Sequence, residues 1–179
     1  QLAALGALFK YLQITNLKPM KHLSLPRVVK KSETMQLDAS TIVNLNLLAS
    51  QGKGSLIAIM DENMTGMGKR KLKQWLLTPR TDVHKIERRL DTVQSLSEDP
   101  LLLEELREYL GCIFDLERIV SRLASDRASP RDLQSLRNSL RILPLVKQLL
   151  MSNPSLRQKG ERIVLFSKEL ELLERALQD

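Results

Sequence analysis

Apolar residues recur every three or four positions along most of the chain, which is the period of an amphipathic helix. The first such stretch runs from Leu2 to Ile14, with leucines along one side. The pattern fails between residues 15 and 37, where Pro19 and Pro26 interrupt the chain. We therefore expect an N-terminal helix followed by a long connection, with room for one short strand near residues 27–37.

Polar residues that commonly cap helices precede the next apolar stretches. Asp38 is suited to start a helix, and Thr65 is suited to start another that must end before Pro79. Between them, residues 55–60 form a short apolar run that fits either a helix or a strand.

The most regular stripe predicts a helix near residues 82–97. It consists of Ile86, Leu90, Val93 and Leu96. Asp99 and Pro100 provide a cap and a first-turn proline for a helix that reaches about Cys112. Asp115 is expected to start another helix, whose buried side would hold Leu116, Ile119, Val120 and Leu123.

Ser129-Pro130-Arg131-Asp132 is the clearest helix start in the sequence, because serine can cap the backbone amide of Asp132 and proline fits the first helical position. Pro144 should kink or break this helix. A last long helix is expected over residues 153–178. Its apolar seam is Ile163, Phe166, Leu170, Leu173 and Leu177.

Composition supports the helical interpretation. Aromatic residues make up 3% of the chain, and seven glycines and seven prolines are few for a turn-rich β-sandwich. We predict an all-α fold, with an irregular multi-helix core and a long C-terminal helix.

The net charge of +7 permits an acidic partner such as nucleic acid, although both signs alternate along the helices as on an ordinary solvated surface. The only cysteine, Cys112, lies in an apolar run and is expected to be buried. No run of about 18 apolar residues suggests a membrane span. Because Gln1 stands where an initiator methionine would, we expect the chain to belong to a longer protein.

No motif for catalysis, cofactor binding or metal binding stands out. Residues 65–70 and 51–55 contain Gly-Lys pairs, but their spacing does not fit a phosphate-binding loop. His22 and His84 are far apart in the sequence, which argues against a histidine metal site. A basic cluster at the start of one helix contains candidates for DNA-backbone contacts, namely Lys69, Lys71 and Lys73.

Several of these segments, taken in order, resemble the core, or lever, domain of the MutS family of DNA mismatch-repair ATPases. The resemblance begins at Met35-Gln36-Leu37-Asp38 and continues through Thr41 and Asn44-Leu45. It closes with Asp115-Leu116-Glu117-Arg118-Ile119 and Ser129-Pro130-Arg131-Asp132-Leu133. Arg80 departs from the family pattern, because an aliphatic residue usually follows the proline that is Pro79 in this chain. The motif positions that we expect to be structural are Asp38, Thr65, Gly68, Arg70, Trp75, Arg89, Asp115, Arg118, Arg122, Pro130 and Asp132.

The resemblance implies a division of the chain. Residues 1–14 would end a connector domain, residues 15–152 would form the helical core, and residues 153–179 would begin a lever helix that runs toward a clamp domain outside this sequence. This chain would be non-catalytic, while the longer protein would use ATP, ADP and Mg²⁺ in its own ATPase domain.

The resemblance also implies partners. The longer protein would bind mismatched double-stranded DNA, a second MutS-type subunit and a MutL-type repair factor, but no membrane. It would be cytoplasmic and nucleoid-associated in a bacterium, and nuclear in a eukaryote.

We hypothesise that the segment couples DNA binding to the ATPase. Trp75, Leu90 and Leu123 would form a packed base, and the helix over residues 153–178 would be the moving arm. The alternative is a stand-alone basic helical module that binds nucleic acid or protein. Sub-micromolar binding of duplex DNA with a steep salt dependence would favour that alternative.

Overall fold

The computed structural model describes residues 2–15, 34–48 and 54–177, and within them the fold is all-α, as predicted. The helices are α1 (Leu2–Thr15), α2 (Ala39–Asn44), α3 (Leu56–Met60), α4 (Gly66–Leu77), α5 (Val83–Ser97), α6 (Pro100–Gly111), α7 (Leu116–Ala124), α8 (Pro130–Ser152), α9 (Arg157–Glu161) and α10 (Ser167–Ala176). Most of the predicted strand lies outside the described residues. At its described end, Thr34 forms an isolated antiparallel bridge with Arg80.

Helix starts are set by short polar side chains that accept a hydrogen bond from the first turn. Asp38, Thr65, Asp82, Asp99 and Asp115 each accept from the backbone amide three residues ahead. The same holds for Ser55, so the short apolar run of uncertain type is a helix. All of these caps precede the helices that the sequence predicted there, or resolve an open assignment.

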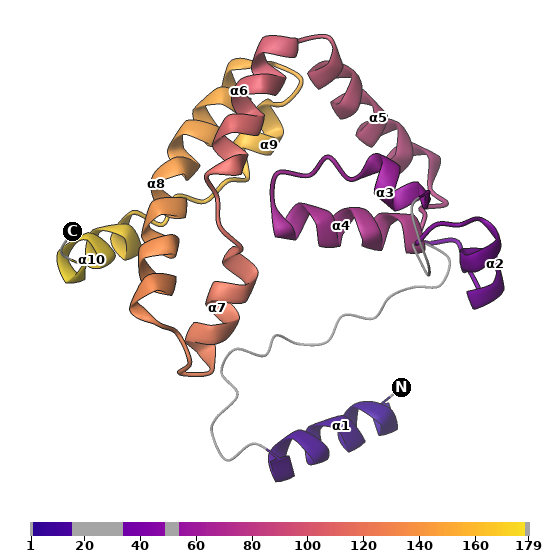
Figure 1. Cartoon of the computed structure of the whole chain (residues 1–179), viewed down its shortest axis with the longest axis horizontal. Coiled ribbons are helices and arrows are strands. Elements are labelled where there is room, and N and C mark those ends of the chain that lie inside the picture. The colour runs from indigo at the N-terminus through magenta and orange to yellow at the C-terminus, as the bar shows by residue number, and fades with distance from the viewer. Residues whose placement is uncertain (1, 16–33, 49–53, 178–179) are drawn as a thin grey trace.

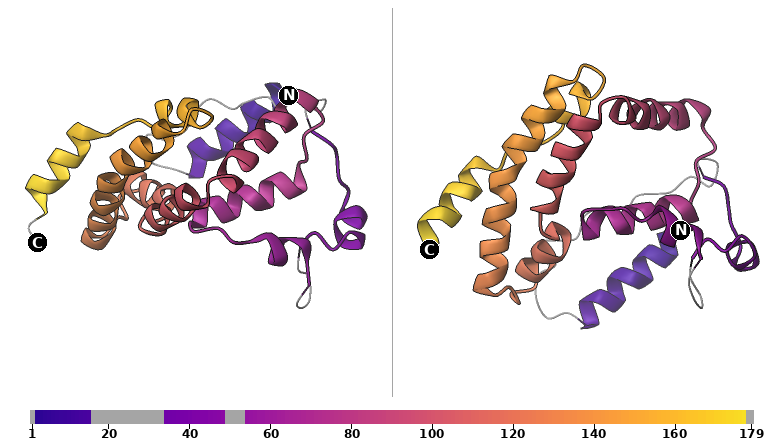
Figure 2. Two further views of the ribbon diagram at one scale, coloured as in Figure 1. Left: turned by 90° about the horizontal axis from the view of Figure 1, so that it is seen from above. Right: turned by 45° about the horizontal axis from the view of Figure 1, so that its top comes forward.

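The long helix α8 organises the C-terminal half of the molecule. It packs against α6, α7, α9 and α10, and it runs beside α6 in each view (Figures 1 and 2). The side chains that this packing buries are mostly leucine and other aliphatic residues. They are Leu102 and Leu106 of α6, Ile119 of α7, Leu140 and Val146 of α8, and Leu156 before α9.

The predicted helix over residues 153–178 is wrong as a single element, because two short helices, α9 and α10, occupy this range. Gly160 packs so closely on α8 that an added Cβ would lie 2.8 Å from Cγ of Met151. The Lys147 ammonium donates to the backbone carbonyl of Ile163 at 2.9 Å. This bond satisfies a carbonyl that a continuous helix would use internally, so the chain leaves the helical path after α9.

Pro144 does not break α8, which continues through it to Ser152. A proline inside a helix forfeits one backbone hydrogen bond and costs roughly 3 kcal/mol. Packing against four neighbouring helices outweighs that cost here.

Several side chains expected in the core are exposed. Cys112 lies on the surface, and Val120 is exposed although its neighbour Ile119 is buried. The stripe of α5 faces outward for most of its length, with Leu90 60% exposed. Trp75 is 41% exposed, so the hypothesis that Trp75 and Leu90 form a packed base is wrong for this structure.

Candidate functional site

The start of α4 is built around close backbone packing. The hydroxyl of Thr65 accepts from the amide of Gly68 at 3.0 Å. A Cβ on Gly68 would lie 2.9 Å from Oδ1 of Asn63, so this position suits glycine. These contacts confirm the cap predicted at Thr65 and hold the first turn in place for the side chain that follows.

Arg70 projects from this first part of α4 and binds α7, which follows it in the sequence by more than 40 residues. Its Nη1 and Nη2 donate to the two carboxylate oxygens of Asp115, each at 2.7 Å. Its Nε donates to Glu117 at 3.0 Å. The planar guanidinium therefore uses its fork on one carboxylate and its edge on a second, a geometry that lysine lacks.

Asp115 is also the N-cap of α7. Oδ1 accepts from the backbone amide of Arg118 at 3.3 Å, and the Arg118 guanidinium lies 3.5 Å from Oδ2. A Cβ added to Gly66 would come within 2.9 Å of the same Oδ2. The carboxylate is thus enclosed by the first turns of two helices.

This arrangement shifts the pKa values of Asp115 and Arg70. The hydrogen bonds from Arg70 lower the pKa of Asp115 to about 2, against a partial opposing effect of burial. The same carboxylate and that of Glu117 raise the pKa of Arg70. Asp115 therefore stays ionised throughout the neutral range.

A second arginine–aspartate pair joins the other end of α7 to α8. Arg122 lies in the last turn of α7, and its Nη2 donates to Oδ1 of Asp132 at 2.5 Å. Oδ2 of Asp132 accepts from the backbone amide of Ser129 at 2.9 Å, while the Ser129 hydroxyl accepts from the Asp132 amide. This reciprocal capping box, with Pro130 at the first helical position, is the start of α8 that the sequence predicted.

The Ser129 backbone amide, and then Arg122, lower the pKa of Asp132 to about 2. We call Arg70, Asp115, Arg122 and Asp132 the relay. The first pair links Arg70 of α4 to the aspartate that caps α7, and the second links Arg122 in the last turn of α7 to Asp132 in the first turn of α8. Together they tie α7 at both ends.

The remaining predicted residues lie elsewhere. The guanidinium of Arg89 stacks on the ring of Trp75 at 3.8 Å and so joins α5 to α4. Asp38 caps α2, where the side chain of Thr41, and then its backbone amide, lower the pKa of Asp38, and it takes no part in the relay.

The candidate DNA-contacting lysines have mixed surroundings. Lys69 pairs with Asp61 at 2.5 Å, and Lys71 donates to the side chain of Gln74. Lys73 is exposed. Lys69 and Lys71 therefore already have partners within the chain, so their ammonium groups are partly used before any contact with DNA.

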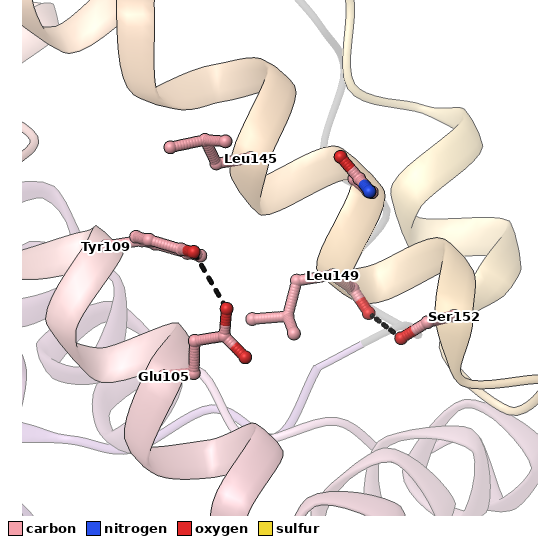
Figure 3. A pocket seen from close by; sticks show the side chains of 6 residues that line it. Glu105, Tyr109, Leu145, Leu149 and Ser152 are labelled. Carbon is pink, nitrogen blue, oxygen red and sulfur yellow. Dashed lines mark hydrogen bonds between the residues drawn. The ribbon is translucent and has the colours of Figure 1, made fainter.

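An open cavity of about 340 Å³ lies between α6 and α8 (Figure 3). Leu145 and Leu149 form its apolar part, and Tyr109 donates to Glu105 at 2.7 Å across its α6 side. The hydrogen bond to Glu105 raises the pKa of Tyr109. The cavity offers few polar groups to a ligand, because the carboxylate of Glu105 and the phenol of Tyr109 already bind each other.

Within residues 2–15, 34–48 and 54–177, no three histidine, cysteine or acidic side chains gather as metal ligands. The helices of the same ranges also include none that is long and apolar enough to cross a bilayer. The relay joins α4 to α7 through residues 45 positions apart, and α7 to α8 through residues 10 positions apart.

Sequence reasoning missed Glu117 and Gly66. Glu117 stood inside a quoted motif, two residues after Asp115, and its charge could have suggested a shared partner. Nothing local to Gly66 signals the approach of Asp115, which only the tertiary fold produces.

Comparisons with known proteins give matches over most of this chain. A family model described as MutS domain III matches residues 40–179. The DNA mismatch repair protein MutS of Petrotoga mobilis is 41% identical over 180 residues, covering 99% of this chain and 22% of that protein. The MutS proteins of Thermosipho melanesiensis and Thermotoga petrophila are 39% and 37% identical and cover 98% and 99% of this chain. The chain spans about a fifth of the length of these curated relatives, at 21–22% of each.

Proposed function

Because this chain belongs to the MutS family of DNA mismatch repair proteins, in which it matches domain III, we propose that it transmits conformational change between DNA-binding and ATPase parts of a longer protein. The observation that carries this proposal is the relay. A displacement of α4 pulls on Asp115 through the fork of Arg70, and α7 carries it to Arg122 and so to the start of α8.

Rigidity along this route follows from its chemistry. Both arginine–aspartate pairs are short. Asp115 also accepts from the backbone amide of Arg118 in the helix that it caps, and Asp132 accepts from the backbone amide of Ser129, the N-cap of α8. Such charge-assisted bonds hold orientation as well as distance. A packed helix between two fixed ends transmits displacement where a loop would absorb it.

We propose a different moving arm from the one expected from the sequence. The sequence placed it in residues 153–178, but these residues form two short helices. The only element of comparable length among the described residues is α8, with 23 residues. We therefore assign the arm to α8, whose start is bound by the relay and whose far end carries α9.

The partners of the longer protein belong to the same proposal. It binds mismatched double-stranded DNA, acts with a second MutS-type subunit and recruits a MutL-type factor. ATP, ADP and Mg²⁺ bind in an ATPase domain outside this chain. The support is the family membership together with the names of the relatives.

The proposal is tested in the longer protein by replacing Arg122 with glutamine, which keeps hydrogen-bonding capacity but removes the charge that binds Asp132. DNA-stimulated ATP hydrolysis should fall severalfold, while DNA affinity and ATPase activity without DNA stay near wild type. Arg157→Gln removes an exposed ion pair within α9 and serves as the control. Equal DNA stimulation in both variants would show that coupling does not pass through the relay.

A further inference from the structure

A buried serine of α8 binds the backbone segment that leads into α7. Ser139 lies inside α8, and 0% of its surface is exposed. Its hydroxyl donates to the backbone carbonyl of Ser135, one turn earlier in the helix, at 2.8 Å. A hydroxyl carries one hydrogen, so the oxygen is left to accept. It accepts from the backbone amide of Phe114 at 3.0 Å.

The amide of Phe114 lies where the chain passes from α6 to α7. The amides of the two residues before it still bind carbonyls in the last turn of α6. The residue after it is Asp115, which caps α7 and binds the fork of Arg70. The Phe114 side chain is 49% exposed, so the backbone amide makes the defined contact with α8. Ser139 therefore holds the chain one residue before the first aspartate of the relay.

This contact and the second arginine–aspartate pair attach α7 to α8 at two points. Arg122, late in α7, binds Asp132, early in α8, whereas Phe114, before α7, binds Ser139, further along α8. The attachment points are seven residues apart on α8 and eight apart on the α7 side, which correspond to about 10 and 12 Å of helix. The two lengths match, so α7 lies along α8 in the opposite direction (Figure 1). Ile119, between the two points, is 2% exposed.

We propose that Ser139 is a positioning residue of the relay, which anchors the start of α7 directly to α8. A displacement that Asp115 receives from Arg70 then reaches α8 by two routes. The long route runs along α7 to the second arginine–aspartate pair, and the short route passes from the Phe114 amide to Ser139. This role of Ser139 rests on the proposed coupling function and adds a second route to it.

The first experiment measures exchange of single amides by NMR in the 179-residue chain. Ser139→Ala removes the acceptor and should speed exchange of the Phe114 amide about tenfold, as expected for a lost buried hydrogen bond. The informative amide is that of Arg118, whose acceptor is Asp115. It should also exchange severalfold faster, because Asp115 is no longer held in place.

Two further variants separate positioning from a general loss of stability. Ser135→Ala removes a hydroxyl one turn away in α8, keeps the carbonyl that Ser139 binds, and is the matched control. Ser139→Cys keeps the size of the side chain while sulfur accepts only weakly, so its effect should be smaller and in the same direction. An Arg118 amide that exchanges as in the control in both Ser139 variants would overturn the proposal.

Combining Ser139→Ala with Arg70→Gln tests whether both residues position the same carboxylate. Residues that act on one group have non-additive effects, whereas independent effects add. The increase in Arg118 exchange caused by Ser139→Ala should therefore be smaller in the Arg70→Gln background. Ser135→Ala should have the same effect in both backgrounds. Additive effects of Ser139→Ala and Arg70→Gln would show that Ser139 supports the fold without positioning Asp115.

The second experiment measures DNA-stimulated ATP hydrolysis of the longer protein, at a temperature where hydrolysis without DNA matches wild type. Arg122→Gln leaves the short route intact, so adding Ser139→Ala should abolish the stimulation that remains, whereas adding Ser135→Ala should not. If Ser139→Ala changes nothing in the Arg122→Gln background, the short route is wrong and the coupling function stands. If Arg122→Gln and the double variant both match wild type, the coupling function fails as well.

Discussion

Single acidic residues at helix starts have two roles in this chain. Asp115 caps α7 by accepting from the amide of Arg118, and Asp132 completes the capping box of α8 by accepting from the amide of Ser129. Each aspartate also binds an arginine from the preceding helix of the relay. A substitution at either position therefore removes a helix cap and a tertiary link together. This dual use explains why local capping patterns in the sequence also marked the long-range contacts.

Acid should weaken the fold through these two carboxylates. Their pKa values are lowered from 3.8 to about 2 in the folded chain, so their stabilising contribution is complete above pH 4 and is lost as pH falls from about 4 to 2. Urea unfolding at a series of pH values should show the free energy of unfolding falling across this window. Asp115→Asn should make the fall shallower, and an unchanged slope would mean that the pair with Arg70 does not persist in solution.

Trp75→Ala should cost less than a buried tryptophan would. The ring is 41% exposed, and its specific contact is the stack with Arg89, worth about 0.5–1 kcal/mol. Adding partial burial, we expect a loss of roughly 1–2 kcal/mol in unfolding free energy, below the 3–5 kcal/mol typical of core positions. Chemical denaturation measures this directly, and a core-sized loss would indicate that the ring is covered in solution.

At the scale of elements, helix starts were predictable from sequence because their determinants are local. A capping side chain and the amide that it binds lie three residues apart, as at Thr65, Asp99 and Ser129. Exposure was less predictable, since an apolar stripe such as that of α5 shows which face is apolar but not whether another element covers it.

The break between α9 and α10 could not be predicted for a related reason. It depends on contacts with α8. Lys147 of α8 binds the backbone carbonyl of Ile163, 16 residues further along the chain, and Gly160 packs against Met151 of α8. The partners of Arg70 and Arg122 were likewise outside local reasoning, although the importance of both residues was visible in the motifs.

Gly160→Ala tests the docking of α9 on α8. Its Cβ would meet Cγ of Met151 at 2.8 Å and the Lys147 carbonyl oxygen at 3.1 Å, so the helices must separate. Overpacking of this kind typically costs about 1–3 kcal/mol. Gly6→Ala is the control, because no atom within 4 Å crowds that position in α1, and it should stabilise by roughly 0.5–1 kcal/mol. If Gly160→Ala and Gly6→Ala moved the denaturation midpoint in the same direction, the close packing of Gly160 on α8 would be contradicted.

At the scale of the whole molecule, the relay converts separate helices into a connected frame. α4 lies far from α7 in the sequence, whereas α7 and α8 are consecutive, and two arginine–aspartate pairs join the three helices in series. The C-terminal segment is fixed to the same long helix, where Arg141 binds Glu174 at 2.9 Å. A disturbance at α4 should therefore be felt along α8, which is the central claim of the proposed function.

Hydrogen exchange of the 179-residue chain with Arg70→Gln tests that claim most directly. The matched control is Arg107→Gln, which removes an exposed pair with Glu62 outside the relay. We predict that Arg70→Gln speeds amide exchange in the first turns of both α7 and α8, although among the described residues Arg70 hydrogen-bonds to the start of α7 and not to α8. Faster exchange confined to α4 and the first turn of α7, with α8 as protected as in the control, would contradict transmission through the relay.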